Sequence, residues 1–187
     1  MQDIQAFFRD ILNDLRVELG DEFDRNFERK GFFDQLWPGS RWPNSRGSLL
    51  LRTGAGRRSI RGAVVAMSVV WRSSLPYMRL HNEGGEITVT AKMKRFFWAM
   101  HYKAANALVY SVKTRATRNT KRNAKLTAEA EIWKMMALKA VGSKIKVPKR
   151  QFIGWHPKVD KMVDVVVYRN LEDYLDQQWQ KIQSKHK

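Results

Sequence analysis

The chain has 187 residues, a hydrophobic fraction of 43%, 35 Lys and Arg against 18 Asp and Glu, and no cysteine. This length and composition fit one folded domain with its own core, and the missing cysteines exclude disulfides, thiolate metal sites and a cysteine nucleophile. The formal charge of +17 predicts affinity for polyanions, chiefly nucleic acid or an acidic partner surface.

A long amphipathic helix is expected from about Asp3 to Arg29, because apolar residues recur there at steps of three and four. Residues 34–47 contain Trp-Pro and Pro-Gly pairs and predict a loop. Residues 49–60 pass from an apolar run into a glycine turn. No Gly-Lys-Ser/Thr follows that turn, so a plain turn is favoured over a phosphate-binding loop.

Residues 60–66 and 68–73 are rich in valine and predict an antiparallel pair of strands. Residues 86–90 and 144–147 alternate between polar and apolar side chains and add further short strands. We therefore expect an α+β fold with a small antiparallel sheet of three to four strands. Between these strands, residues 76–80 predict a short helical turn, and Gly84-Gly85 supplies the freedom to adopt positive φ.

The second half of the chain predicts three helices with a basic segment between the first two. Helical spacing extends from Ala91 to Lys113, from Ala128 to Val141, and from Pro157 into a C-terminal end that frays after Lys181. Residues 114–126 are basic with few apolar anchors, which predicts a flexible insertion. Because no composition shift marks a boundary, residues 1–187 are expected to form a single domain.

No catalytic constellation can be read in the sequence. The four histidines show no metal-binding spacing, no Gly-x-Ser-x-Gly elbow occurs, and the carboxylates do not cluster as a two-metal site requires. We expect no metal, no cofactor and no enzyme activity, and a nuclease or other hydrolase is the weaker alternative. The chain has no basic and apolar leader and no run of eighteen apolar residues, so we expect a soluble protein without export signal or membrane contact.

The strongest local feature is a stretch from Glu86 to Glu129 without any acidic residue between them. Its cations are candidate contacts for DNA or an acidic partner: Lys92, Lys94, Arg95, Arg115, Arg118, Lys121, Arg122 and Lys125. Phe96, Phe97 and Trp98 stand beside them and could stack single-stranded bases. The alternatives are that one or two of these rings face the core, which the helical spacing favours, and that the cations form only a solvated face.

Three stretches far apart in the chain combine turn-forming residues with apolar anchors. They are Leu51-Arg52-Thr53-Gly54 with Arg58-Ser59-Ile60, Pro76-Tyr77 with His81-Asn82-Glu83-Gly84-Gly85, and Val147-Pro148-Lys149-Arg150-Gln151-Phe152-Ile153-Gly154. Together, and in this order, they resemble the phage virion morphogenesis family. That family includes tail-completion proteins of P2-like phages and the G protein of Mu-like phages.

The resemblance implies a small α+β subunit of a phage or prophage, acting in the virion at the neck where head and tail join. It implies a homo-oligomeric ring, neck and tail proteins as partners, and the host cytoplasm as the place of assembly. Residues 114–126 look like an insertion relative to the family. The alternative function is a basic nucleic-acid-binding module that uses residues 92–125.

The family motifs imply structural or interface roles for ten residues of this chain. They are Thr53, Gly54, Tyr77, His81, Gly84, Gly85, Pro148, Arg150, Phe152 and Gly154. By this resemblance the middle four shape a turn between strands and the last four set the approach to the final helix. Arg150 would pair with a carboxylate, and Phe152 would plug a neighbouring surface.

Overall fold

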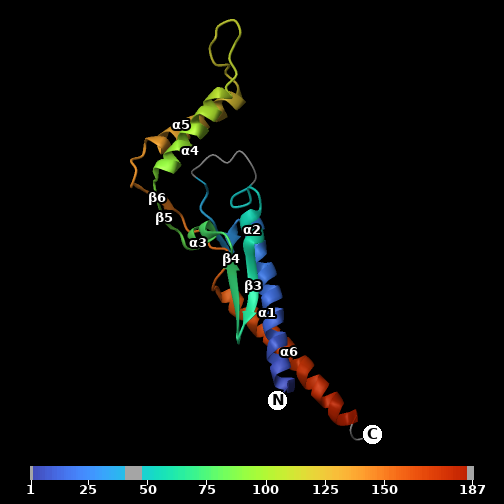
Figure 1. Cartoon of the computed structure of the whole chain (residues 1–187). Coiled ribbons are helices and arrows are strands. Elements are labelled where there is room, and N and C mark those ends of the chain that lie inside the picture. Colours follow the sequence, from blue (N-terminus) through green and yellow to red (C-terminus); the bar gives the residue numbers. More distant parts are fainter. Residues whose placement is uncertain (1, 41–47, 185–187) are drawn as a thin grey trace. The chain divides into compact units, whose positions relative to one another are not determined.

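The computed structural model describes residues 2–40 and 48–184 (Figure 1). The chain divides into two compact units. The terminal unit comprises Met1–Pro38, Gly47–Glu83 and Lys149–Lys187, and the middle unit comprises Gly39–Arg46 and Gly84–Pro148. The division into two compact units does not test the prediction that residues 1–187 form a single domain, which stays a prediction. Part of the predicted loop, residues 41–47, and the last three residues of the predicted frayed end lie outside the described residues.

Two 28-residue helices run through the terminal unit, and both were predicted from their apolar spacing. α1 spans Gln2–Arg29 and α6 spans Pro157–Ser184. They pack side by side in opposite directions (Figure 1). The Phe7 and Tyr174 rings lie 4.8 Å apart, and Arg169 Nη2 reaches Asp14 Oδ2 at 3.3 Å and Glu18 Oε1 at 2.5 Å.

Two antiparallel hairpins and two short helices complete the terminal unit. β1 (Gly31–Phe32) pairs with β2 (Gln35–Leu36), and β3 (Ile60–Val65) pairs with β4 (Ser68–Ser73). The β3–β4 hairpin confirms the predicted valine-rich pair, and its turn contains Ala66 at φ 52°. It packs against α1, where the Phe23 and Trp71 rings meet at 5.2 Å. α2 spans Ala55–Ser59 and α3 spans Pro76–Glu83.

The terminal unit buries two hydrophobic clusters. The first gathers the inward side chains of α1, the β1–β2 hairpin and α6: Ile11, Leu15, Leu19, Phe23, Phe32, Phe33 and Val166. The second lies at the C-terminal end of α1 and contains Phe27, Trp37, Met78 and Phe152. The helical periodicity of α1 therefore supplies both clusters, the second through its last apolar residue.

The middle unit consists of two packed helices and one strand pair. α4 (Ala91–Asn106) packs against α5 (Lys121–Leu138), and β5 (Gly85–Thr88) pairs with β6 (Lys144–Val147) in antiparallel register from Gly85↔Val147 to Thr88↔Lys144. The core of this unit contains Val89, Phe97, Met136, Ala137 and Ile145.

The α+β class is confirmed, but the predicted sheet of three to four strands is wrong. Among the described residues, the strands form three separate two-stranded antiparallel sheets. Alternating polarity identifies a strand and says nothing about its partner. In the described structure β5 and β6 pair only with each other, although α4 and α5 lie between them in the sequence.

Two helix boundaries in the middle unit also differ from the prediction. α4 ends at Asn106 rather than Lys113, although Leu108 and Val112 continue its apolar spacing. Val112 is 98% exposed, so this continued spacing has no packing partner. α5 begins at Lys121 because the Thr120 hydroxyl caps it, accepting from Asn123 N at 3.1 Å. Residues 121–126 are therefore helical, and the flexibility of residues 114–120 stays a prediction.

Candidate functional site

Parts of the three family-like stretches pack together within the terminal unit, at a place we call the motif junction, where Leu51 and Ile60 contact the cluster of Met78 and Phe152. Its centre is formed by Gly56 of α2, Met78 of α3, and Phe152 in the segment before α6. A Cβ added at Gly56 would lie 2.6 Å from Met78 Sδ, so a larger residue in α2 would require the buried Met78 side chain to move. Met78 and Phe152 belong to the same buried cluster, with 2% and 1% of their surface exposed.

Backbone hydrogen bonds join the second motif to the third. Arg150 N donates to the His81 carbonyl oxygen at 2.7 Å. The Asn82 side chain accepts from two successive amides through Oδ1, Phe152 N at 2.9 Å and Ile153 N at 3.1 Å. The segment before α6 is therefore held on the end of α3.

Asn26 of α1 completes the junction, and it was not among the residues predicted from the sequence. Its side chain is fully buried, its Nδ2 donates to the Phe152 carbonyl at 3.1 Å, and its Oδ1 accepts from Phe33 N at 3.0 Å. Trp37 Nε1 donates to the Gln151 carbonyl at 2.5 Å. An asparagine within a helix carries no pattern that predicts such long-range bonds, so no signal in the sequence could have identified it.

Two motif glycines have the backbone freedom expected of them. Gly54 adopts φ 69° where α2 begins, beside Thr53, whose Oγ1 accepts from Ala55 N at 3.3 Å. Gly154 adopts φ 135°, and a Cβ there would lie 2.7 Å from Gln151 Nε2. Both positions therefore disfavour any other residue.

The second motif differs from the predicted turn between strands. Tyr77 and His81 lie within α3, and only Gly84 (φ 75°) and Gly85 (φ 150°) form the turn that ends this helix. Pro76 suits the first position of a helix, and the helix that begins there extends to Glu83, beyond the single helical turn that was predicted. His81 Nδ1 is buried without a hydrogen-bond partner among the described residues. Burial and, less strongly, the charge of Arg150 lower the pKa of His81, which favours a neutral imidazole near pH 7.

The third motif corrects one of the roles implied by the resemblance. Phe152 is buried in its own unit, against Phe27 at 5.1 Å, so it cannot plug a neighbouring surface. Arg150 is also buried, its Nε donates to the Pro38 carbonyl at 3.0 Å, and burial lowers its pKa. Pro148 directly follows β6 and is exposed. Carboxylate pairing of Arg150 stays a prediction.

A pocket of about 610 Å³ beside the start of α6 contains an Asp–His pair. His156 Nε2 lies 3.0 Å from Asp34 Oδ1, and His156 Nδ1 accepts from Lys158 N at 3.2 Å. Both ring nitrogens are thus engaged in the structure, which leaves neither free to take a proton from a substrate. Among the described residues, no group of His, Asp and Glu is arranged to hold a metal ion.

The middle unit holds most of the charge of the chain. Residues 84–148 contain 14 Lys and Arg and 3 Glu, a formal charge of +11 out of +17. Within the described part of this unit, the ion pair between Lys144 and Glu86 is the only one, with Nζ and Oε2 2.9 Å apart. All eight cations predicted as contacts are therefore free of carboxylates there, and seven are exposed while Lys94 is half-buried. Such a surface attracts polyanions.

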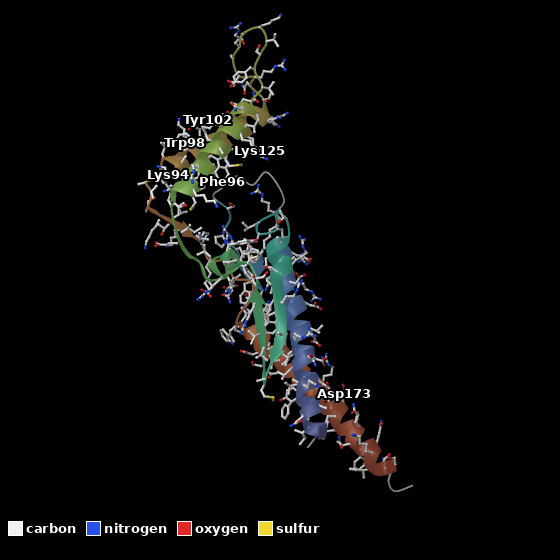
Figure 2. All side chains as sticks on the ribbon, viewed as in Figure 1. Lys94, Phe96, Trp98, Tyr102, Lys125 and Asp173 are labelled. Atoms are coloured by element: carbon white, nitrogen blue, oxygen red, sulfur yellow. The ribbon has the colours of Figure 1, made fainter. Side chains whose placement is uncertain are left out.

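The structure separates the three aromatic residues that were considered together as a possible surface for base stacking. Phe97 is 7% exposed and lies in the core, which confirms the core alternative for this ring. Phe96 and Trp98 are two residues apart and so lie on opposite sides of α4 (Figure 2). Phe96 meets Trp133 edge-on at 6.0 Å, whereas Trp98 stacks on Tyr102 with centroids 5.9 Å apart and planes inclined by 25°.

A different set of side chains follows one side of α4, and we call it the aromatic row: Lys94, Trp98 and Tyr102. They are spaced by four residues, so they lie one above another along the helix (Figure 2). Tyr102 is 57% exposed. It was missed in the sequence, although its i, i+4 spacing from Trp98 was a usable signal.

Between α4 and α5 the chain forms the basic loop, residues 107–120, and Asn123 closes its base. Asn123 is 3% exposed, its Nδ2 donates to the carbonyls of Val109 and Arg118 at 2.7 Å each, and its Oδ1 accepts from Val109 N at 3.1 Å. Farther out, Tyr110 and Thr117 form an antiparallel bridge, and Ser111 N donates to the Ala116 carbonyl at 2.8 Å. These hydrogen bonds hold the two ends of the loop together, and Arg115 and Arg118 belong to the loop that they close.

No family model, curated protein or solved structure matches this chain. The family expected from the three motifs is therefore a proposal. None of the helices in the described residues is long and apolar enough to cross a membrane.

Proposed function

We propose that this chain is a structural subunit of a phage or prophage that acts at the head–tail neck, completing the tail and joining it to the head as part of a ring. The observation that carries the proposal is the motif junction. Three stretches with the order and residue types of virion morphogenesis proteins are distant in sequence, yet Leu51 and Ile60 of the first pack on the buried cluster of Met78 and Phe152. Asn82 of the second accepts from Phe152 N of the third. Gly56, by contrast, stands where the family often has an apolar residue. If this chain has the same structural core as virion morphogenesis proteins, the stretches that resemble them should pack together in its interior.

An exposed apolar row on α6 supports self-association of this subunit. The row consists of Tyr168, Leu171, Leu175, Trp179 and Ile182, with exposed fractions of 66%, 38%, 56%, 63% and 50%. Its spacing of three, four, four and three residues keeps all five side chains on one side of the helix. Contiguous exposed apolar surface of this kind marks a contact with another chain, and a ring needs such contacts between its subunits.

Replacing Leu175 and Trp179 by Glu should therefore dissociate the assembly. Burying each side chain contributes about 1.5–3 kcal/mol, so the double variant should associate at least about 100-fold more weakly. Light scattering over a range of concentrations, with negative-stain images, would measure the change.

Asp173→Lys is the matched control (Asp173 is labelled in Figure 2). Residue 173 is two positions from both Leu171 and Leu175, and this spacing places it on the other side of α6. The substitution should leave the mass of the assembly unchanged. A wild-type chain that stays monomeric at high concentration and does not join purified heads to tails would contradict the proposed function.

A second function, nucleic-acid binding, is favoured by the charge of the middle unit. Lys121, Arg122 and Lys125 lie together in the first turns of α5, next to the basic loop, and all three are exposed without carboxylate partners in the described structure. Cations at a helix N-terminus oppose the helix dipole, so these three residues do not stabilise α5. Binding to phosphate groups is a function that explains their position.

Replacing these three cations by Ala should flatten the salt dependence of DNA binding. Each phosphate contact contributes about 0.9 to the slope of log K against log salt for duplex DNA, so the slope should fall by up to about 2.7. A salt titration by fluorescence anisotropy would measure it. Ala at Lys158 and Lys161, which are exposed cations of the terminal unit, is the control, and an unchanged slope in the triple variant would remove the α5 cations from the binding surface.

A further inference from the structure

We infer that the aromatic row of α4 binds unpaired nucleobases, so that the middle unit prefers single-stranded nucleic acid to duplex. This inference rests on the proposed nucleic-acid binding and assigns its ligand class. It involves Lys94, Trp98 and Tyr102, which are arranged along one side of α4 (Figure 2).

The geometry of the two rings suits stacking on a base. Trp98 and Tyr102 already lie nearly parallel, with planes inclined by 25° and centroids 5.9 Å apart. Trp98 is half-buried against the core cluster that contains Phe97, which holds its indole in place, while Tyr102 is 57% exposed. A ring that is held before binding loses less conformational freedom when a ligand stacks on it.

The positive charge around the aromatic row favours a nucleic acid over an apolar partner as its ligand. An exposed aromatic surface is suited to either an apolar partner or a base, but the segment that carries it, residues 84–148, has a formal charge of +11. Lys94 stands one helical turn from Trp98 in the row, and Arg95 follows it and is exposed. Cations beside stacked rings match a strand whose phosphates and bases alternate.

Whether the bases are paired determines which residues of the row can contact the nucleic acid. In a duplex the flat faces of the bases are covered by their neighbours, so a helix surface can reach phosphates and base edges only. In a single strand the base faces are free, and stacking on an aromatic side chain strengthens binding with little dependence on sequence. The cations serve both forms, whereas Trp98 and Tyr102 serve only the unpaired one.

The test compares binding of a 20-nucleotide oligo(dT) and of a duplex of equal length to the full chain, by fluorescence anisotropy at two salt concentrations. Tyr102→Ala should weaken binding of the single strand by about fivefold to 150-fold, the range for losing one stacked base, and change duplex binding by less than about twofold. Tyr102→Phe keeps the ring and should retain the single-strand affinity. Because Trp98 packs against the core, Trp98→Phe is the safer change there.

Two controls make the outcomes distinct. Phe96→Ala removes a ring that is 53% exposed on the other side of α4, and it should leave both affinities unchanged. The triple Ala variant at Lys121, Arg122 and Lys125 should weaken both ligands. Equal weakening of single strand and duplex by Tyr102→Ala, or no weakening of either, would overturn the base-stacking inference while nucleic-acid binding stands. A wild-type chain that binds neither ligand at low salt would instead overturn nucleic-acid binding itself.

Discussion

Replacing Phe152 by Ala is expected to lower the free energy of unfolding by about 3–5 kcal/mol, the usual loss for a buried phenylalanine. Phe152 is 1% exposed and packs on Phe27 within the cluster that also contains Trp37 and Met78. Its removal would leave a cavity where all three family-like motifs meet. Urea unfolding followed by tryptophan fluorescence would measure the change, since Trp37 lies beside the site.

Leu36→Ala is the control for this experiment, because Leu36 belongs to the same unit and is 80% exposed. It should change the free energy of unfolding by less than about 0.5 kcal/mol. A loss below about 1 kcal/mol for Phe152→Ala would mean that the motif junction does not contribute to stability as its burial indicates. The proposal that the motif junction is a structural core shared with virion morphogenesis proteins would then have no evidence from stability.

Replacing Asn26 by Ala is expected to lower the free energy of unfolding by roughly 2–6 kcal/mol, although it removes only one small polar side chain. Each buried group left without a hydrogen-bond partner costs about 1–3 kcal/mol, and this change leaves two, the Phe152 carbonyl and the Phe33 amide. The same unfolding measurement applies. Hydrogen exchange should also show faster exchange at the Phe33 amide, which loses its acceptor.

Asn170→Ala separates the effect of burial from that of losing an asparagine. Asn170 Nδ2 also makes two hydrogen bonds, to Asp14 Oδ2 and to the Val166 carbonyl at 2.9 Å each, but its side chain is only half-buried. Water can replace bonds at such a position, so the loss should be about 1 kcal/mol. Similar losses for the two variants would show that the Asn26 site is more open to water than its burial indicates.

The long helices and the β3–β4 hairpin were predictable because each depends on a local period. The steps of three and four in α1 and α6 place one apolar side toward the core, and consecutive valine-rich residues in β3 and β4 pair across a short turn. The errors came where the local period continued without a partner. Leu108 and Val112 extend the spacing of α4, yet no element covers Val112, and the chain leaves the helix at Asn106.

Strand pairing and the motif junction were not predictable, because their partners come from distant parts of the chain. β5 and β6 pair although α4, the basic loop and α5 lie between them in the sequence, and Asn26 bonds to Phe152 across 126 residues. Long-range hydrogen bonds leave no periodic trace in either partner. The three side-chain bonds of Asn123, to Val109 and Arg118, are closer in sequence, but they too follow no period.

The α+β class, the long helices, the valine-rich hairpin and the concentration of positive charge between residues 86 and 129 were all predictable from the order of the residues. These follow from composition and from periods that repeat within one element. The folded chain was needed to show which strands pair, that Phe152 faces its own core, and that Trp98 stacks with Tyr102 while Phe96 lies on the other side of α4. Burial and hydrogen bonding depend on which surfaces meet in space, and distant segments of the sequence do not show this.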